Sequence, residues 1–348
     1  MLKSHSAGVG DILRGSAAWR ALLNRFPGAA LHLWLLTREP GYVSEQLMRE
    51  HHLLRSFHAS DKRTNGLRGW YRLVQEGIGI VRQTRPELII DFEPNGCRTS
   101  LLASLLGAWC GAATVGIAQV PLRGVFYQWS ARSTRAYARS RNLSLPLEYA
   151  ERDFVALVPL GIERNGTAIE LRATQAGEEC RQRLRTELGW TDDRPLLGVN
   201  AGCGTADAVA KRPDLDLLAG LITELQRRHD FRVVLTGAKF EREINRELIE
   251  RLGDSQAVVD LAGRTSIGEL TGVIAACRLF VSSDSGPYHM AVGLRVPTLA
   301  IFRWPNPQHY HHQDWIKCCV AQGPEALPRL LEAAEGLLRV APAPELVS

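Results

Sequence analysis

Short, continuous apolar runs alternate with helical patterns along most of the chain, and this alternation restricts the fold more than any other feature. In the second half, such runs occupy residues 196–200, 231–236, 258–261, 279–282 and 298–302, and helical periodicity occupies about 214–229, 241–252 and 266–276. Apolar runs that are bounded by turn residues and separated by helices of about 10–15 residues indicate a parallel sheet covered by helices on both faces.

The first half shows the same alternation less regularly. Residues 11–26 have the apolar spacing of one helix face, which Pro27 and Gly28 end, and strands are predicted at 31–36, 88–92 and 114–117. A chain of 348 residues is long enough for two such domains. We therefore predict an α/β fold with two doubly wound, Rossmann-like domains, 1–170 and 171–348, that face a cleft. A C-terminal helix at about 324–340 could pack back across onto the N-terminal domain.

Composition excludes several classes of protein. The chain is 45% hydrophobic and 23% charged, as in ordinary globular proteins, and no apolar run approaches the ~20 residues of a membrane-spanning helix. Nothing near the first residues resembles a secretory signal. The seven cysteines form no Cys-x-x-Cys pair, which favours reduced thiols, no metal site and a cytoplasmic location.

Positive charge is concentrated in the first half. Residues 1–150 contain 19 Lys and Arg against 10 Asp and Glu, and the segment 123–141 mixes five arginines with aromatic residues. Such a segment could contact an anionic membrane surface or a phosphorylated acceptor, or it could be an ordinary solvated surface. No nucleic-acid-binding motif accompanies it, so we do not expect a nucleic-acid partner.

Ligands of doubly wound sheets bind at the carboxyl ends of the strands, so the loops there are candidate sites. The loop after 279–282 contains Asp284, Ser285 and Gly286, followed by Pro287 and His289. Backbone amides at a helix N-terminus would bind a phosphate here, and His289 could donate to one of its oxygens. Alternatively, Asp284 or Ser285 simply caps the helix and His289 is a satisfied core residue.

Three further loops contain candidate residues. Asp11, in Gly8-Val9-Gly10-Asp11, is either the N-cap of the first helix or a general base. Lys211 follows a glycine-containing loop at 200–205 and suits phosphate charge, although a solvated lysine is equally compatible. Glu241 ends the loop after 231–236 and could accept both hydroxyls of a ribose.

A dinucleotide cofactor is the alternative use of these loops. The spacing of the third glycine after Gly8 and Gly10 is wrong for a dinucleotide fingerprint, and strand 31–36 is followed by Thr37 and Arg38 where the fingerprint requires an acid. A nicotinamide-dependent oxidoreductase is therefore disfavoured.

Taken together, these motifs resemble glycosyltransferase family 9, the heptosyltransferases of lipopolysaccharide core assembly. Gly10-Asp11-Ile12-Leu13 and Arg25-Phe26-Pro27 are similar to the start of that family. Leu235-x-Gly237-x3-Glu241, the segment 260–266 and Asp284-Ser285-Gly286-Pro287-x-His289 follow in the family's order. Only Met1 and Leu2 precede Lys3-Ser4-His5, so the strand before Asp11 is expected to be short or to begin further upstream.

The resemblance implies a GT-B fold and an inverting transfer that needs neither metal nor cofactor. It implies a nucleotide-sugar donor, ADP-heptose first among them, in the C-terminal domain and an anionic glycolipid acceptor in the N-terminal domain, at the cytoplasmic membrane surface. Asp11 becomes the general base, Glu241 a ribose contact and Asp284 a support of its loop. The implied diphosphate contacts are Lys211, Ser285, Gly286 and His289. A non-catalytic nucleotide-sugar-binding protein remains the other alternative.

Overall fold

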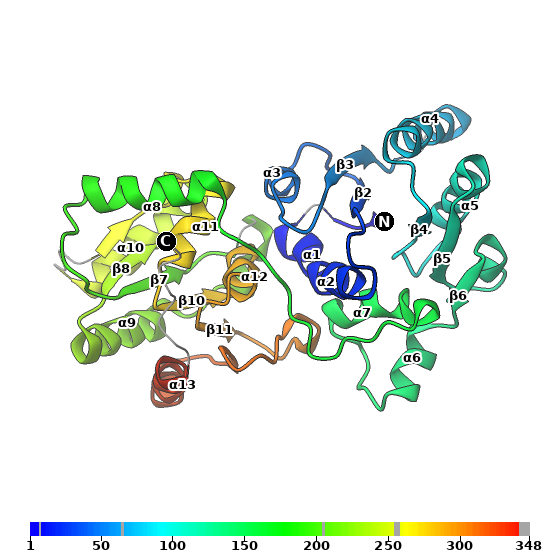
Figure 1. Ribbon diagram of the computed structural model, residues 1–348. Coiled ribbons are helices and arrows are strands. Elements are labelled where there is room, and N and C mark those ends of the chain that lie inside the picture. The colour runs from blue at the N-terminus through cyan, green and yellow to red at the C-terminus, as the bar shows by residue number, and fades with distance from the viewer. Residues whose placement is uncertain (7, 64–65, 204–205, 254–257, 341–348) are drawn as a thin grey trace. The chain divides into compact units, whose positions relative to one another are not determined.

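The computed structural model describes residues 1–6, 8–63, 66–203, 206–253 and 258–340. The chain divides into two compact units, Met1–Ile169 and Glu170–Ser348 (Figure 1). Each unit is an α/β structure with parallel strands, and each is described here by itself.

The strands of the first unit form one parallel arrangement in two parts. These strands are β1 (Leu2–Ser4), β2 (His32–Thr37), β3 (Ser56–Asp61), β4 (Leu88–Ile90), β5 (Ala113–Ile117) and β6 (Trp129–Ala131). The triplets β1-β2-β3 and β4-β5-β6 are joined by a parallel bridge between Leu2 and Asp91. The resulting order β3-β2-β1-β4-β5-β6 is that of a Rossmann fold, whose ligand site lies where the order reverses, between β1 and β4.

Helices cover both faces of this sheet (Figure 1). They are α1 (Val9–Leu13), α2 (Ser16–Arg25), α3 (Ser44–Arg49), α4 (Gly66–Thr84), α5 (Arg98–Cys110), α6 (Thr134–Ser140) and α7 (Tyr149–Val155). Helices α4 and α5 share one core with β1, β2 and β4, built from Leu73, Leu102, Leu106 and Trp34 among others. The helix predicted at 11–26 is divided in two at Arg14 and Gly15, where Gly15 lies tightly against Asp153.

The second unit has a six-stranded parallel sheet in the order β12-β11-β10-β7-β8-β9. Its strands are β7 (Leu196–Asn200), β8 (Arg232–Leu235), β9 (Val258–Asp260), β10 (Leu279–Ser283), β11 (Thr298–Phe302) and β12 (Ile316–Val320). This is the Rossmann order again, with the reversal between β7 and β10. Its helices are α8 (Gln175–Glu187), α9 (Leu215–His229), α10 (Arg242–Leu252), α11 (Ile267–Ala275), α12 (Gly286–Gly293) and α13 (Leu327–Val340).

The C-terminal helix α13 packs within the second unit. Its side chains Leu330, Ala334 and Leu337 are buried in one core with α9 and the inner strands. The apolar face of α13 is thus used inside its own unit. The packing of this helix across onto the N-terminal domain stays a prediction. Among the described residues, none of the helices is both long enough and apolar enough to cross a membrane.

Candidate functional site

The carboxyl ends of β7 and β10 bring the predicted phosphate loop of the second unit against the loop after β7. Ser285 is the N-cap residue of α12, yet its side chain makes no capping bond. Its hydroxyl instead donates to Oδ1 of Asn200 at 3.1 Å and lies 3.0 Å from the hydroxyl of Ser282. Because no side chain caps α12, the amides of its first turn, beginning at Gly286, remain suited to an anion.

Asp284 is the anchor of this loop. Its Oδ2 accepts from Nζ of Lys211 at 2.9 Å and from the side-chain Nδ2 of Asn306 at 3.3 Å. Its Oδ1 lies 2.7 Å from Nδ1 of His309. The Asp284 side chain is 6% exposed, whereas Lys211 is 32% exposed. Burial opposes ionisation, but the bonds from His309 and Lys211 outweigh it and hold the pKa of Asp284 below its usual value. Asp284 therefore carries a negative charge that orients Lys211. Its role in supporting a donor-binding loop stays a prediction.

Histidines from the segment after β11 complete the surroundings of this loop. His289 is 3% exposed, and its Nδ1 lies 2.9 Å from Nε2 of His311. The ligand atoms of Asp284, His289 and His309 lie within 4.8 Å of one another, so among the described residues these three could hold a metal ion. The sequence analysis missed His309, His311 and Asn306. Three histidines within 309–312, in the segment that follows the predicted strand 298–302, are the signal that could have indicated them.

Glu241 is buried and ties two loops together. Its Oε1 accepts from the amide of Cys203 at 2.9 Å, and its Oε2 accepts from the amide of Ala238 at 2.7 Å. Gly202 leaves the space that this carboxylate fills, since a Cβ there would overlap Oε1. The ribose contact stays a prediction, and the geometry adds that Glu241 fixes the loop after β7. Residues 204 and 205 of that loop lie outside the described residues.

In the first unit, Asp11 is not the N-cap of its helix. Gly8 holds that position in α1, and Asp11 lies in the first turn with its side chain 27% exposed. Its Oδ1 accepts from Nη2 of Arg14 at 2.6 Å, and its Oδ2 accepts from the hydroxyl of Ser6. Arg14 itself is buried and stacks 4.3 Å from the ring centre of Tyr149. The carboxylate is thus held in one orientation and remains partly accessible, as a general base must be.

Asp11 lines a small hollow of about 30 Å³ together with His5, Glu93 and Tyr149, among other residues. Burial, aided by the nearby charge of Lys3, lowers the pKa of His5 to about 4, so His5 is neutral at pH 7. Burial, aided by the charge of Asp91, raises the pKa of Glu93. Glu93 follows β4 at the point where the strand order reverses, and the sequence analysis overlooked it. A carboxylate directly after the predicted strand 88–92 is the signal that could have found it.

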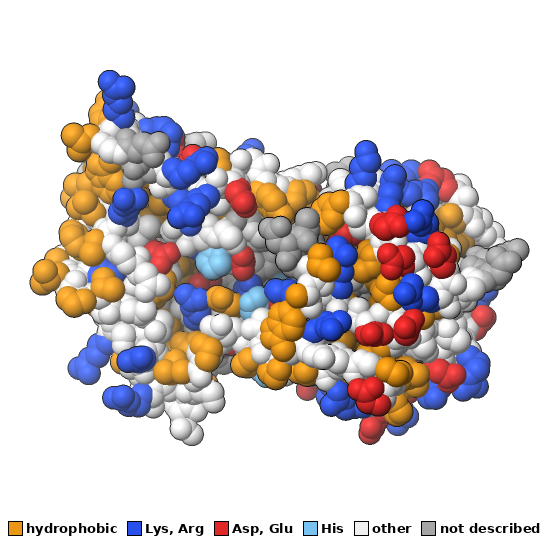
Figure 2. All heavy atoms as spheres, turned by 180° about the vertical axis from the view of Figure 1, so that it is seen from behind, with side chains coloured by type: hydrophobic (Ala, Val, Ile, Leu, Met, Phe, Trp, Pro, Cys, Tyr) orange, Lys and Arg blue, Asp and Glu red, His pale blue; other side chains and the backbone are white. Residues whose placement is uncertain are grey.

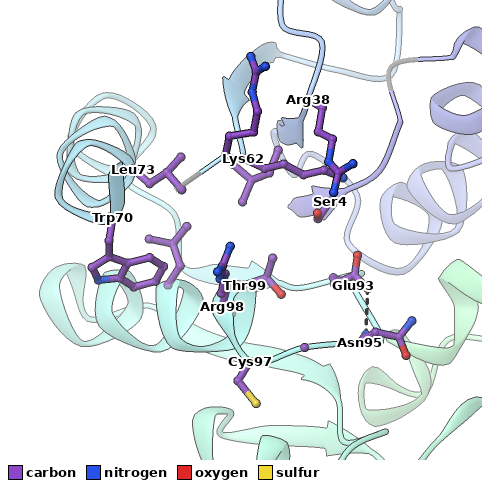
Figure 3. Close-up of a pocket in the computed structure, with 14 residues that line it drawn as sticks. Ser4, Arg38, Lys62, Trp70, Leu73, Glu93, Asn95, Cys97, Arg98 and Thr99 are labelled. Carbon is purple, nitrogen blue, oxygen red and sulfur yellow. Dashed lines mark hydrogen bonds between the residues drawn. The ribbon is translucent and has the colours of Figure 1, made fainter. Parts of the chain in front are cut away.

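A larger cavity of about 620 Å³ adjoins this hollow and shares Ser4 and Glu93 with it. Four cations line it, Arg38, Lys62, Arg63 and Arg98, coming from the segments that follow β2, β3 and β4. Figure 3 shows Trp70 and Leu73 of α4 on one side and Glu93 with Asn95 on the other. The cavity therefore combines apolar and cationic side chains, and Glu93 is the carboxylate among the residues that line it.

The basic segment 123–141 is only in part a surface. Arg123 is fully buried, and its guanidinium donates to Oδ2 of Asp91 at 2.8 Å. The hydroxyl of Tyr127 donates to the same oxygen at 2.7 Å. Tyr137 is also buried. Arg123 fits neither of the uses suggested for this segment, contact with an anionic partner or an ordinary solvated surface, because it is buried and paired with Asp91. Arg132, Arg135 and Arg139 remain exposed.

Two Rossmann-ordered units, each with its candidate residues at the reversal of strand order, define a protein of the GT-B class. The solved glycosyltransferase family 9 protein of Veillonella parvula aligns with a TM-score of 0.72 at 19% identity, over 98% of this chain and 97% of that one. The Escherichia coli ADP-heptose lipopolysaccharide heptosyltransferase II aligns with a TM-score of 0.65 at 20% identity, over 97% and 98%. At these identities the likeness establishes the fold.

Sequence comparison assigns the family. The model of glycosyltransferase family 9 (heptosyltransferase) matches residues 123–324, which is more than half of the chain, and the chain belongs to that family. It is 34% identical over 110 residues to lipooligosaccharide heptosyltransferase 2 of Campylobacter jejuni, covering 31% of this chain and 34% of that protein. It is 30% identical over 156 residues to lipopolysaccharide heptosyltransferase 3 of Escherichia coli, covering 44% and 43%. These matches span less than half the length of either relative.

Proposed function

We propose that the chain is an inverting glycosyltransferase that moves a heptose from ADP-heptose to a lipopolysaccharide core or related glycolipid. The observation that carries the proposal is the pairing of Lys211 with Asp284 beside an uncapped helix N-terminus, at the reversal of strand order in the second unit. Family membership and the lipopolysaccharide heptosyltransferases among the relatives support the choice of donor and acceptor.

The proposed reaction is a single displacement. Asp11 takes the proton of an acceptor hydroxyl, the hydroxyl oxygen bonds to the anomeric carbon, and the bond from that carbon to the diphosphate oxygen breaks. The electron pair leaves with the nucleoside diphosphate, whose charge is stabilised by the backbone amides of Ser285 and Gly286 at the N-terminus of α12 and by Lys211 and His289. A positioned general base contributes about 10²–10⁴-fold, and preorganised donors at a leaving group about 3–4 kcal/mol each. Lys211 supplies the positive charge here, so the proposed reaction needs no metal.

The acceptor side is proposed to use the cationic cavity of the first unit. A phosphorylated or carboxylated sugar would pair with cations such as Arg38, Lys62 and Arg98, while its reacting hydroxyl extends past Ser4 toward Asp11. Ser4 and Glu93, which line both hollows, mark that path. Glu241 is proposed to border the ribose through the loop it fixes. Because the acceptor is a glycolipid, we propose that the protein works at the cytoplasmic surface of the membrane.

The test compares two carboxylates of the first unit. Asp11→Asn keeps the shape of the side chain, so we expect transfer from ADP-heptose to fall by about 10²–10⁴-fold while calorimetric ADP affinity stays unchanged. Glu93→Gln is the variant that discriminates, because Glu93 is the second carboxylate beside the same path. If Glu93→Gln abolishes transfer and Asp11→Asn does not, the base is Glu93.

Transfer and binding measurements also distinguish the two rival functions. A non-catalytic binding protein would bind ADP-heptose and release no ADP with any acceptor. A nicotinamide-dependent oxidoreductase would bind NAD in preference to ADP-heptose, although β8, like β2, is not followed by the ribose-binding acid: Thr236 comes next. Asp216→Asn is the matched control, since Asp216 is an exposed carboxylate paired with Arg251, and we expect it to be silent.

A further inference from the structure

Helix α5 presents an apolar stripe to solvent. Leu101, Leu105 and Trp109 recur every four residues and are 38%, 44% and 47% exposed. The helix contains no acidic residue, and Arg98 at its start is its single charged residue. A surface helix of a globular protein ordinarily turns charged and polar residues toward water, so a stripe of this kind indicates a contact.

Helix α4 extends the stripe beside α5. The two helices pack on the same side of the sheet, and on α4 Leu67 is 88% and Tyr71 66% exposed. Arg82 of α4 lies 5.1 Å from the ring centre of Trp109, which links the far ends of the two helices. Figure 2 shows hydrophobic side chains gathered on the outer side of the first unit, at the left, with Lys and Arg among them. We name this surface the α4–α5 face and define it by Leu67, Tyr71, Leu101, Leu105 and Trp109.

The positive charge around this face indicates an anionic partner. Arg68 and Arg72 lie beside the exposed apolar residues of α4, and Arg82 and Arg98 flank the stripe of α5, whereas Glu76 is the only acid in these two helices. Leucine, tryptophan and tyrosine bordered by arginine is the composition that enters the headgroup region of an anionic bilayer. The excess of Lys and Arg in residues 1–150 acts in the same direction.

The position of the face agrees with a lipid-linked acceptor. Trp70 and Leu73 of α4 and Arg98 and Leu102 of α5 line the 620 Å³ cavity, so the same two helices bear both the stripe and the cationic pocket. We infer that the α4–α5 face docks the protein on an anionic phospholipid surface and so brings the cavity to sugars that project from that surface. The reason for docking rests on the proposed function, transfer to a glycolipid. The docking itself does not, because membrane binding can be measured without an acceptor.

The experiment is vesicle sedimentation of the full chain. The probes are vesicles of phosphatidylcholine with phosphatidylglycerol in equal parts, and vesicles of phosphatidylcholine alone. We expect binding to the anionic vesicles, with the double variant Leu101→Gln/Leu105→Gln binding about tenfold or more weakly. The matched control is Leu143→Gln/Leu145→Gln, two leucines of the same unit that are 38% and 54% exposed, and it should bind like the wild type.

Three outcomes overturn the inference. One is no binding of the wild type to anionic vesicles, and another is equal loss of binding in the test and control variants. The third is a wild-type dimer in sedimentation velocity that Leu101→Gln/Leu105→Gln dissociates while vesicle binding persists, which would make the face a contact between two copies. Turnover separates this inference from the proposed function: the test variant should transfer normally to a deacylated, water-soluble acceptor and poorly to one embedded in vesicles.

Discussion

Replacing Gly202 by alanine tests how the loop after β7 is held. The added methyl group would overlap Oε1 of Glu241, and the carboxylate would have to leave the position in which it accepts from the amides of Cys203 and Ala238. Hydrogen bonds to a charged group contribute about 1.5–3 kcal/mol each. Losing both bonds, one of them from the buried residue Cys203 and the other from the exposed residue Ala238, should cost the second unit about 3 kcal/mol. For a unit of this size that corresponds to a fall of roughly 6–12 °C in its Tm.

A double-mutant cycle makes the argument falsifiable. Glu241→Ala removes the same two bonds and also removes the atoms that a methyl group on Gly202 would meet. The double variant should therefore be no less stable than Glu241→Ala alone, a coupling of about 3 kcal/mol between the two positions. Calorimetric unfolding of the four proteins gives the cycle, and ADP affinity should fall in parallel if the loop serves the donor. Additive losses, or a Gly202→Ala variant as stable as the wild type, would refute the reasoning.

Three further outcomes follow from the same geometry. His289→Ala should weaken ADP binding by about tenfold or more if this buried imidazole donates to the diphosphate, as we propose, and unchanged affinity in calorimetry would remove His289 from the site. Dialysis against a chelator should leave transfer unchanged because Lys211 already neutralises Asp284, and activity that returns only with an added divalent ion would contradict this. His5→Gln should stabilise the protein relative to the wild type only in acid. The folded pKa of about 4 lies below the usual 6.5, so the unfolded chain takes up the proton first. The wild type should thus lose at most about 3 kcal/mol more than the variant between pH 6.5 and 4, in denaturant titrations at each pH. A constant difference across that range would exclude burial of a neutral imidazole.

The interior of both sheets could be predicted because parallel strands buried on both faces leave continuous apolar runs in the sequence. Strands β7 and β11 begin and end where the pattern places them. The strands that were not predicted, β3, β6 and β12, lie at sheet edges and include polar or charged residues. The first strand, β1, was expected to be short, and it has three residues. Strands this short or this poor in apolar residues show neither a continuous apolar run nor a sustained alternation of apolar and polar residues.

In the candidate site, too, some residues could be predicted from the sequence and others could not. Asp284 and Ser285 could be placed because they directly follow a recognisable strand, so the chain itself puts them at the carboxyl edge of the sheet. The partners of Asp284 could not, because His309 and Asn306 reach it only after the chain has passed through another strand. Arg123 shows the opposite error. A cationic side chain in a basic segment is expected to be exposed. Only the fold shows that Arg123 is buried and paired with Asp91.

The charges around Asp284 bear on how a leaving diphosphate could be stabilised. A metal ion held by Asp284, His289 and His309 would have to compete with the ammonium of Lys211, which lies 2.9 Å from the aspartate and donates to it. As long as that pair persists, the aspartate is a weak ligand and Lys211 is a fixed cation, one-third exposed at the helix N-terminus. A diphosphate that approached would then meet helix amides and an ammonium whose positions are set before it arrives, so little reorganisation is needed as charge develops. Lys211→Met is the variant that separates the two arrangements: it should lower turnover whether or not metal is present, whereas rescue by a divalent ion would show that the three ligands can replace the lysine.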